Sequence, residues 1–196
     1  RNSSGDLIGV TTTYFNEEST EVSGVDLNFN RLISTSDKYG NVSLSINSTI
    51  LIEFLTPALS NEGGEFMIDR VGKFNYDTNT HSLPKNRINA FLNWKYQYYD
   101  INFNSRYIDG YSNQRSINSL GTLYGYNNSV DSFFVHDLSL KRQLFTNKGE
   151  IDIKLSIINL FDESAPRLYD APDFSFDTRV HDPRGRIVGI NFEYRH

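Results

Sequence analysis

The segment Pro183-Arg184-Gly185-Arg186-Ile187-Val188-Gly189-Ile190-Asn191-Phe192-Glu193-Tyr194-Arg195-His196 decides the fold class of this chain. Within it, Val188, Ile190, Phe192 and Tyr194 alternate with small or polar residues. Alternation at period two is typical of a β-strand with one apolar face and one polar face. Similar runs recur along the sequence, whereas helical periodicity is hard to find. The sequence therefore predicts an all-β protein.

The other alternating runs share the same division into an apolar and a polar face. They cover residues 25–30, 41–56, 87–98, 101–107, 137–140 and 151–157. Leu51 breaks the pattern of the second run. The polar face carries Ser, Asn and charged residues, which argue against the dry core of a β-sandwich. These residues suit an antiparallel up-and-down transmembrane β-barrel with a wet interior.

The connections between these runs alternate in length. The short ones are predicted at 34–40, 99–100 and 146–149, and the long ones at 57–83, 111–130 and 162–182. Bacterial outer-membrane barrels alternate short periplasmic turns with long extracellular loops. Counting back from the last strand places every short connection on the periplasmic side.

The N-terminal segment 6–33 has two interpretations. It is either one long strand with a break near Asn16 or two strands joined there. The single strand is preferred, with residues 14–24 projecting above the bilayer. The chain is then expected to contribute about seven or eight strands to a larger barrel.

Composition excludes several classes. No apolar run approaches the roughly eighteen residues of a transmembrane helix. The net charge of −5 is spread along the chain without a basic run, so nucleic acid is not an expected partner. The absence of cysteine excludes disulfides and thiolate zinc sites. The 14 Phe and 12 Tyr suit the aromatic girdles of outer-membrane barrels.

Several short motifs follow one another in a fixed order. They are Tyr14-Phe15-Asn16, Gly24-Val25-Asp26-Leu27, Leu83-Pro84-Lys85-Asn86-Arg87, Tyr107-Ile108-Asp109-Gly110, Val135-His136-Asp137-Leu138, Asn159-Leu160-Phe161-Asp162 and Asp182-Pro183-Arg184-Gly185-Arg186. Together they resemble the C-terminal barrel portion of a TonB-dependent outer-membrane receptor. The family usually ends in Phe or Trp, whereas His196 ends this sequence.

The resemblance implies that residues 1–196 are the C-terminal part of a receptor barrel in the bacterial outer membrane. The plug domain and the TonB-contacting box are expected outside this chain, and the rest of the barrel belongs to the same or a companion chain. The implied partners are the TonB complex, outer-membrane lipid and a small-molecule ligand such as a siderophore, glycan or corrinoid. The implied function is active uptake of that scarce solute. The alternatives are a passive porin or small structural outer-membrane barrel, and a soluble β-rich adhesin.

Candidate ligand contacts are aromatic residues of the long connections, since loops carry specificity on a rigid frame. They are Tyr76, Tyr124, Tyr126 and Tyr169. A tyrosine stacks on a sugar or aromatic ring and offers a polar handle, although capping the loop bundle is the more ordinary role for each.

No cofactor, metal site or catalytic residue is predicted. The histidines at 81, 136, 181 and 196 are too scattered for a metal site, and the acidic residues of 162–182 lack a calcium-loop spacing. Arg184 and Arg186 are interpreted as part of a structural turn. No nucleophile elbow or phosphate loop is found, so the protein is not expected to be an enzyme.

Overall fold

The computed structural model describes residues 5, 9, 19–59, 65–76, 81–171 and 174–196. Antiparallel strands dominate these residues, which confirms the all-β prediction. The elements are β1 (Glu21–Ser36), β2 (Gly40–Leu59), β3 (Glu65–Asp69), β4 (Asn86–Tyr96), β5 (Tyr99–Ile108), β6 (Tyr111–Ser112), α1 (Ser119–Leu123), β7 (Ser129–Val130), β8 (Phe133–Thr146), β9 (Gly149–Ile158) and β10 (Ile187–Arg195). No described helix has the length and apolar character required to cross a membrane.

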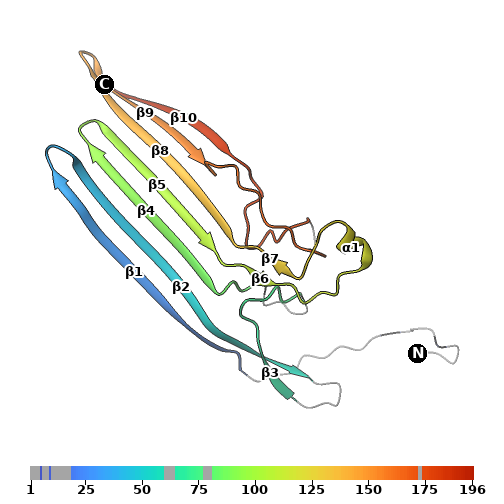
Figure 1. Ribbon diagram of the computed structural model, residues 1–196. Helices are drawn as coiled ribbons and strands as arrows, with labels where there is room; N and C mark the ends of the chain where they lie inside the picture. The colour runs from blue at the N-terminus through green and yellow to red at the C-terminus, as the bar shows by residue number, and fades with distance from the viewer. Residues whose placement is uncertain (1–4, 6–8, 10–18, 60–64, 77–80, 172–173) are drawn as a thin grey trace.

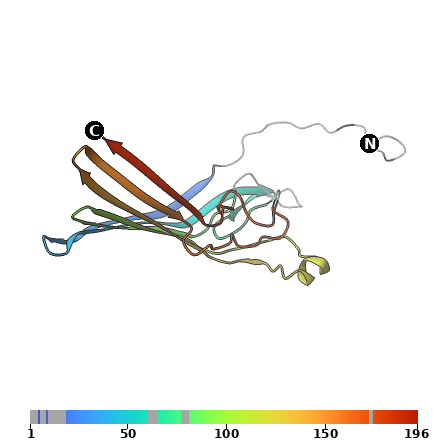
Figure 2. The ribbon, with the colours of Figure 1, turned by 90° about the horizontal axis from the view of Figure 1, so that it is seen from above.

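One large sheet contains most of the strands, in the order β1-β2-β4-β5-β8-β9-β10, with β3 added to the far end of β2. The tight turns lie at one end of this sheet and the long connections at the other (Figure 1). The sheet is curved (Figure 2). Within the described residues β1 and β10 do not pair with each other, so the sheet has two free edges and is not a closed barrel.

Strand register keeps an apolar and a polar row of side chains on separate faces from β2 to β10. One row of paired residues is Leu44, Leu92, Phe103, Leu138, Ile157 and Val188. The adjacent row is Ser43, Asn93, Asn102, Ser139, Ser156 and Gly189. Because successive side chains point to opposite faces, these rows define an apolar face and a polar face.

Side chains on the polar face are hydrogen-bonded across strands. The Asn93 amide donates to the Asn102 oxygen at 2.7 Å, and the Thr49 hydroxyl donates to Asp26 at 2.7 Å. Near the turn end, the buried Asp152 pairs with Lys141 at 2.8 Å and with Arg195 at 2.5 Å. The second pair ties the polar face of β10 to β9.

The predicted turn at Tyr99-Asp100 is wrong, because the chain reverses at Gln97-Tyr98. Tyr99 and Asp100 instead open β5. This register places Lys95 opposite Asp100, with 3.6 Å between the ammonium and the carboxylate. Gln97 adopts a left-handed backbone (φ 51°), as two-residue hairpin turns require.

The predicted connection at 57–83 starts later than expected. β2 continues through Pro57 to Leu59, and β3 pairs back along it, so this connection begins as an extension of the hairpin. The connection at 111–130 contains β6, β7 and α1. A β-bulge at Ile52 shifts the pairing by one residue, since Glu53 and Leu51 pair with the consecutive β1 residues Ser23 and Gly24. Beyond the bulge Glu53 and Phe54 exchange faces, so the predicted alternation of 41–56 is wrong at its end, whereas Leu51 stays on the polar face.

At the N-terminal end, β1 begins at Glu21 and pairs with β2 from there. The predicted break near Asn16 lies outside the described residues. The described residues 21–24, predicted to project above the bilayer, belong to the β1–β2 ladder.

Candidate functional site: the loop cluster

The long connections meet at one end of the sheet, and we call this assembly the loop cluster (residues 66–76, 81–85, 109–132 and 159–186 among those described) (Figure 1). Its core contains Phe74, Tyr111, Val130 and Leu168, with Ala171 and Val180 packed against them. Leu168 is 1% exposed although its segment has no regular secondary structure. Every buried hydrophobic side chain among the described residues belongs to this core or to the adjoining end of β8.

A buried polar network links the three long connections. The Asp177 carboxylate accepts hydrogen bonds from the Ser82 hydroxyl and from the Tyr111 hydroxyl, the latter at 3.4 Å. The Tyr111 hydroxyl also lies 3.3 Å from Nε2 of His181. Because each connection supplies at least one member, the network fixes the connections relative to one another.

His181 is the titratable centre of this network. Its ring stacks on Tyr111 with a centroid distance of 6.0 Å and meets the edge of Phe133 at 5.2 Å. Burial lowers the pKa of His181 to about 4, although the Asp177 charge acts in the opposite direction. Burial and the same carboxylate raise the pKa of Tyr111. Both side chains are therefore neutral at pH 7.

Asn75 shapes the first connection from inside. It is 1% exposed and has a left-handed backbone (φ 54°). Its amide nitrogen donates to the carbonyls of Arg70 at 2.9 Å and His81 at 2.9 Å. The Asn75 amide thus supplies hydrogen bonds to two backbone carbonyls of an irregular segment, where no neighbouring strand supplies them.

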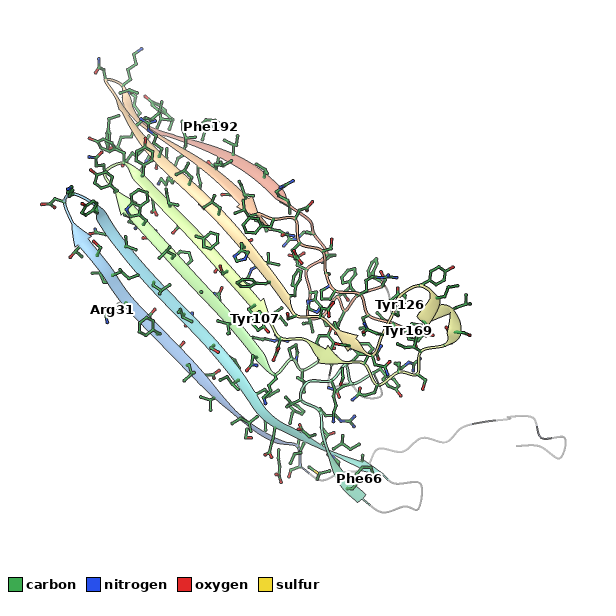
Figure 3. All side chains as sticks on the ribbon, viewed as in Figure 1. Arg31, Phe66, Tyr107, Tyr126, Tyr169 and Phe192 are labelled. Atoms are coloured by element: carbon green, nitrogen blue, oxygen red, sulfur yellow. The ribbon has the colours of Figure 1, made fainter. Side chains whose placement is uncertain are left out.

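The four predicted tyrosines all lie in the loop cluster. Tyr126 and Tyr169 are in edge-to-face contact with centroids 5.6 Å apart, and both are labelled in Figure 3. The Arg167 guanidinium covers the Tyr126 ring at 4.2 Å and donates to the Tyr124 carbonyl at 3.0 Å. The sequence carries no signal for this proximity, because residues 124–126 and 167–169 are far apart along the chain.

Tyr76 belongs to a second cation–π pair. The Arg115 guanidinium lies 4.5 Å from the Tyr76 ring centroid and also pairs with the Asp170 carboxylate. Tyr76 and Tyr124 are exposed, whereas Tyr126 and Tyr169 are half-buried. Contact between these tyrosines and a ligand stays a prediction.

The Asn-Leu-Phe-Asp and Asp-Pro-Arg-Gly-Arg motifs fit together at the base of the last connection. We call Asn159, Asp162, Gly185 and Arg186 the clasp. The Asn159 side chain bonds both the amide and the carbonyl of Glu163 at 2.8 Å, and Asp162 accepts from the Arg186 amide at 2.7 Å. A Cβ at position 185 would lie 2.7 Å from the Asp162 carboxylate, so a larger residue there would displace this carboxylate from the Arg186 amide.

Arg184 and Asp182 stabilise the same region. The Arg184 guanidinium donates to both carboxylate oxygens of Asp182, with contacts of 2.7 to 3.1 Å. These bonds lower the pKa of Asp182 to about 2. This ion pair joins two residues of the turn that precedes β10.

The remaining histidines are engaged separately. Nδ1 of His81 lies 2.6 Å from the Arg179 guanidinium, and Nδ1 of His136 lies 2.8 Å from the Ser105 hydroxyl. Among the described residues, no group of three His, Asp or Glu side chains is placed to hold a metal ion.

Comparison with known proteins gives no match: no family model, no curated protein and no solved structure matches this chain.

Proposed function

We propose that residues 1–196 form the C-terminal part of the barrel of a TonB-dependent receptor in the bacterial outer membrane. The complete protein takes up a scarce solute, such as a siderophore, glycan or corrinoid, and is not an enzyme. The observation that carries the proposal is the two-faced register of the sheet. Exposed side chains such as Ile190 (62%) and Phe192 (69%) share one face, and hydrocarbon would be a favourable environment for that face.

Strand length supports this location. β4, β5, β9 and β10 contain 11, 10, 10 and 9 residues. A tilted transmembrane β-strand needs roughly 9–11 residues to cross the hydrocarbon core.

Aromatic residues at the turn end provide further support. The Trp94 and Tyr96 rings stack at 6.2 Å, and Tyr98 meets Phe145 edge-to-face at 5.4 Å. The Trp94 indole donates to the Tyr39 carbonyl at 2.8 Å, which leaves its apolar body on the apolar face. Amphipathic rings in such a row favour a membrane–water interface, here the periplasmic one.

The free edges of β1 and β10 require further strands in a membrane. Unpaired backbone groups are costly in lipid, so further strands of the same or a companion chain would pair with these edges. A plug would fill the barrel, and a region outside this chain would contact the TonB complex. In this arrangement the loop cluster is extracellular, and Tyr76, Tyr124, Tyr126 and Tyr169 contact the ligand.

Cysteine labelling tests the location, because the chain contains no cysteine of its own. Single variants Ile190→Cys and Asn191→Cys sit side by side on β10 but on opposite faces. In lipid vesicles, a water-soluble maleimide is expected to label Asn191→Cys and spare Ile190→Cys. In whole cells, Tyr124→Cys is expected to react from outside. Equal labelling at positions 190 and 191 would rule out the lipid-facing assignment and favour the soluble adhesin.

Energy dependence tests active transport against a passive porin. Cells carrying the protein are given labelled siderophores, glycans and corrinoids, with and without a protonophore. Uptake by a TonB-dependent receptor is expected to stop when the proton gradient collapses. Uptake that continues unchanged would identify a passive pore.

A further inference from the structure

One arginine departs from the division of β4, β5, β8, β9 and β10 into two faces. The register and the alternation of side chains place all five carboxylates of these strands on the polar face, namely Asp100, Asp137, Glu150, Asp152 and Glu193. The Lys and Arg side chains of these strands lie on the polar face as well, with the exception of Arg142 in β8. In a membrane, a charge on the apolar face is costly and marks a site with a partner.

The side chains around Arg142 on this face are apolar or aromatic. Arg142 pairs with Tyr99 on one side and with Ile153 on the other, and Ile153 pairs in turn with Phe192. The guanidinium carbon lies 5.2 Å from the centroid of the Tyr99 ring. The side chain is exposed, and no carboxylate of the described residues forms an ion pair with it. Arg142 is therefore an accessible cation without a counter-ion in the described chain.

Arg142 lies at the level of the aromatic row near the turns. It is four residues before the end of β8. Its partner Tyr99 pairs with Tyr96, and the Tyr96 ring stacks on Trp94. Amphipathic rings favour the head-group level of a bilayer, and long basic side chains reach towards the same level. The guanidinium is thus placed where lipid phosphates would lie.

The strands that would complete a barrel are not placed to supply the counter-ion of Arg142. β8 lies between β5 and β9, whereas added strands would pair with β1 and β10. A plug would face the polar side of the sheet. Arg31 is also on the apolar face, but β1 is an edge strand, so a strand added there is a nearer source of its counter-ion (Figure 3). The partner of Arg142 therefore comes from outside the barrel wall.

We propose that Arg142 binds the phosphate of an anionic phospholipid in the leaflet at the turn end. The planar guanidinium donates two parallel hydrogen bonds to phosphate oxygens, and the acyl chains lie along Leu140, Ile153 and Phe192. The single negative charge of a lipid such as phosphatidylglycerol neutralises the single guanidinium. This lipid site depends on the proposed membrane location of the sheet, which the test checks separately.

The test uses the full chain in vesicles that contain phosphatidylcholine and phosphatidylglycerol. The chain has one tryptophan, so Trp94→Phe combined with Leu140→Trp moves this reporter beside Arg142 without adding a second one. Bromine atoms on the acyl chains of either lipid quench the tryptophan fluorescence. At equal lipid fractions, brominated phosphatidylglycerol is expected to quench more strongly, equivalent to about fivefold tighter binding than phosphatidylcholine. High salt should reduce this preference.

Variants of the reporter chain assign the preference to one side chain. Arg142→Gln is expected to remove it, and Arg142→Lys to keep part of it, because lysine retains the charge but not the planar fork. Lys154→Gln is the matched control, since it removes a positive charge from the polar face of the neighbouring strand β9 and should leave the preference unchanged. Circular dichroism confirms that each variant is folded.

The possible outcomes separate the lipid site from the membrane location. Equal quenching by the two lipids, or a folded Arg142→Gln variant that keeps the preference, overturns the lipid site while the location stands. Absence of quenching by either lipid, together with maleimide labelling of Ile190→Cys, overturns the location and the lipid site with it.

Discussion

The sheet and the loop cluster treat apolar side chains in opposite ways. Along β10, Val188, Ile190 and Phe192 are 58%, 62% and 69% exposed, whereas Val130 and Leu168 of the loop cluster are 2% and 1% exposed. The loop cluster thus buries a small core of its own, as a domain in water does. The sheet is regular yet lacks a covering for its apolar face within the described chain. In this molecule the regular strands form the sheet, whereas the buried apolar core lies mainly among irregular segments.

The largest effect is expected from deleting the centre of the loop core. Leu168→Ala should cost about 2–5 kcal/mol of loop-cluster stability, because it removes a fully buried side chain. Hydrogen exchange at the amides of Phe74, Leu168 and His181 measures this, since each donates a backbone hydrogen bond within the cluster. Phe192→Ala on the sheet is the matched control and should leave these amides protected. Equal loss of protection in both variants would contradict a separate loop core.

A charge on the apolar face is expected to have the next largest effect if that face contacts lipid. Ile190→Arg should destabilise the chain folded in vesicles by about 2–4 kcal/mol near the bilayer centre. Asn191→Arg places the same side chain one residue further on the polar face and should cost far less. Urea unfolding of both variants in vesicles gives the comparison. Similar costs at the two positions would argue against a lipid-facing surface.

Acid is expected to loosen the loop cluster before the sheet. His181 has a pKa of about 4 when folded and about 6.5 when unfolded, so its stabilisation is present above pH 6.5 and is lost as the pH falls towards 4. Between pH 7 and pH 5 the expected loss is about 2 kcal/mol. Hydrogen exchange of the loop amides at both pH values measures it, and His181→Phe should remove this pH dependence. A pH response retained by His181→Phe would assign it to another group.

The smallest expected effect concerns the exposed cation–π contacts. Arg115→Gln removes the contact with Tyr76 and the ion pair with Asp170, and should cost less than about 1 kcal/mol because these groups are partly in water. Arg142→Gln is the sheet counterpart, since Arg142 lies over Tyr99 at 5.2 Å. Thermal unfolding of the two variants in detergent should differ little. A loss above about 2 kcal/mol for Arg115→Gln would show that this pair supports the loop core.

Sequence alternation predicted the sheet well because period two is a local property of a strand. The runs predicted at 87–98 and 151–157 correspond to β4 (Asn86–Tyr96) and β9 (Gly149–Ile158), and the differences lie at the turn ends. The turn at Gln97-Tyr98 lies two residues before the predicted position. Tyrosines occupy positions 96, 98 and 99, so a turn at either position leaves aromatic side chains on the apolar face. The bulge at Ile52 shifts the pattern by one residue, and a simple alternation cannot locate such a shift.

The loop cluster was predictable only in part. The sequence predicted where the long connections lie and marked their tyrosines, but not that Tyr126 and Tyr169 would be in contact. Leu168 and His181 gave no periodic signal, because their burial depends on segments distant in sequence. His181 was grouped with scattered histidines, and only the fold brings it against Tyr111 and Asp177.

The clasp allows the last connection to change in sequence and length without a change in the sheet. Because Asp162 holds the Arg186 amide, the chain leaving β9 and the chain entering β10 are joined independently of the residues between them. Loop closure depends weakly on length, with about 0.6 kcal/mol for each doubling. The segment between them is therefore a cassette. Replacing it would remodel the loop cluster, yet the register of β9 and β10 would survive the exchange.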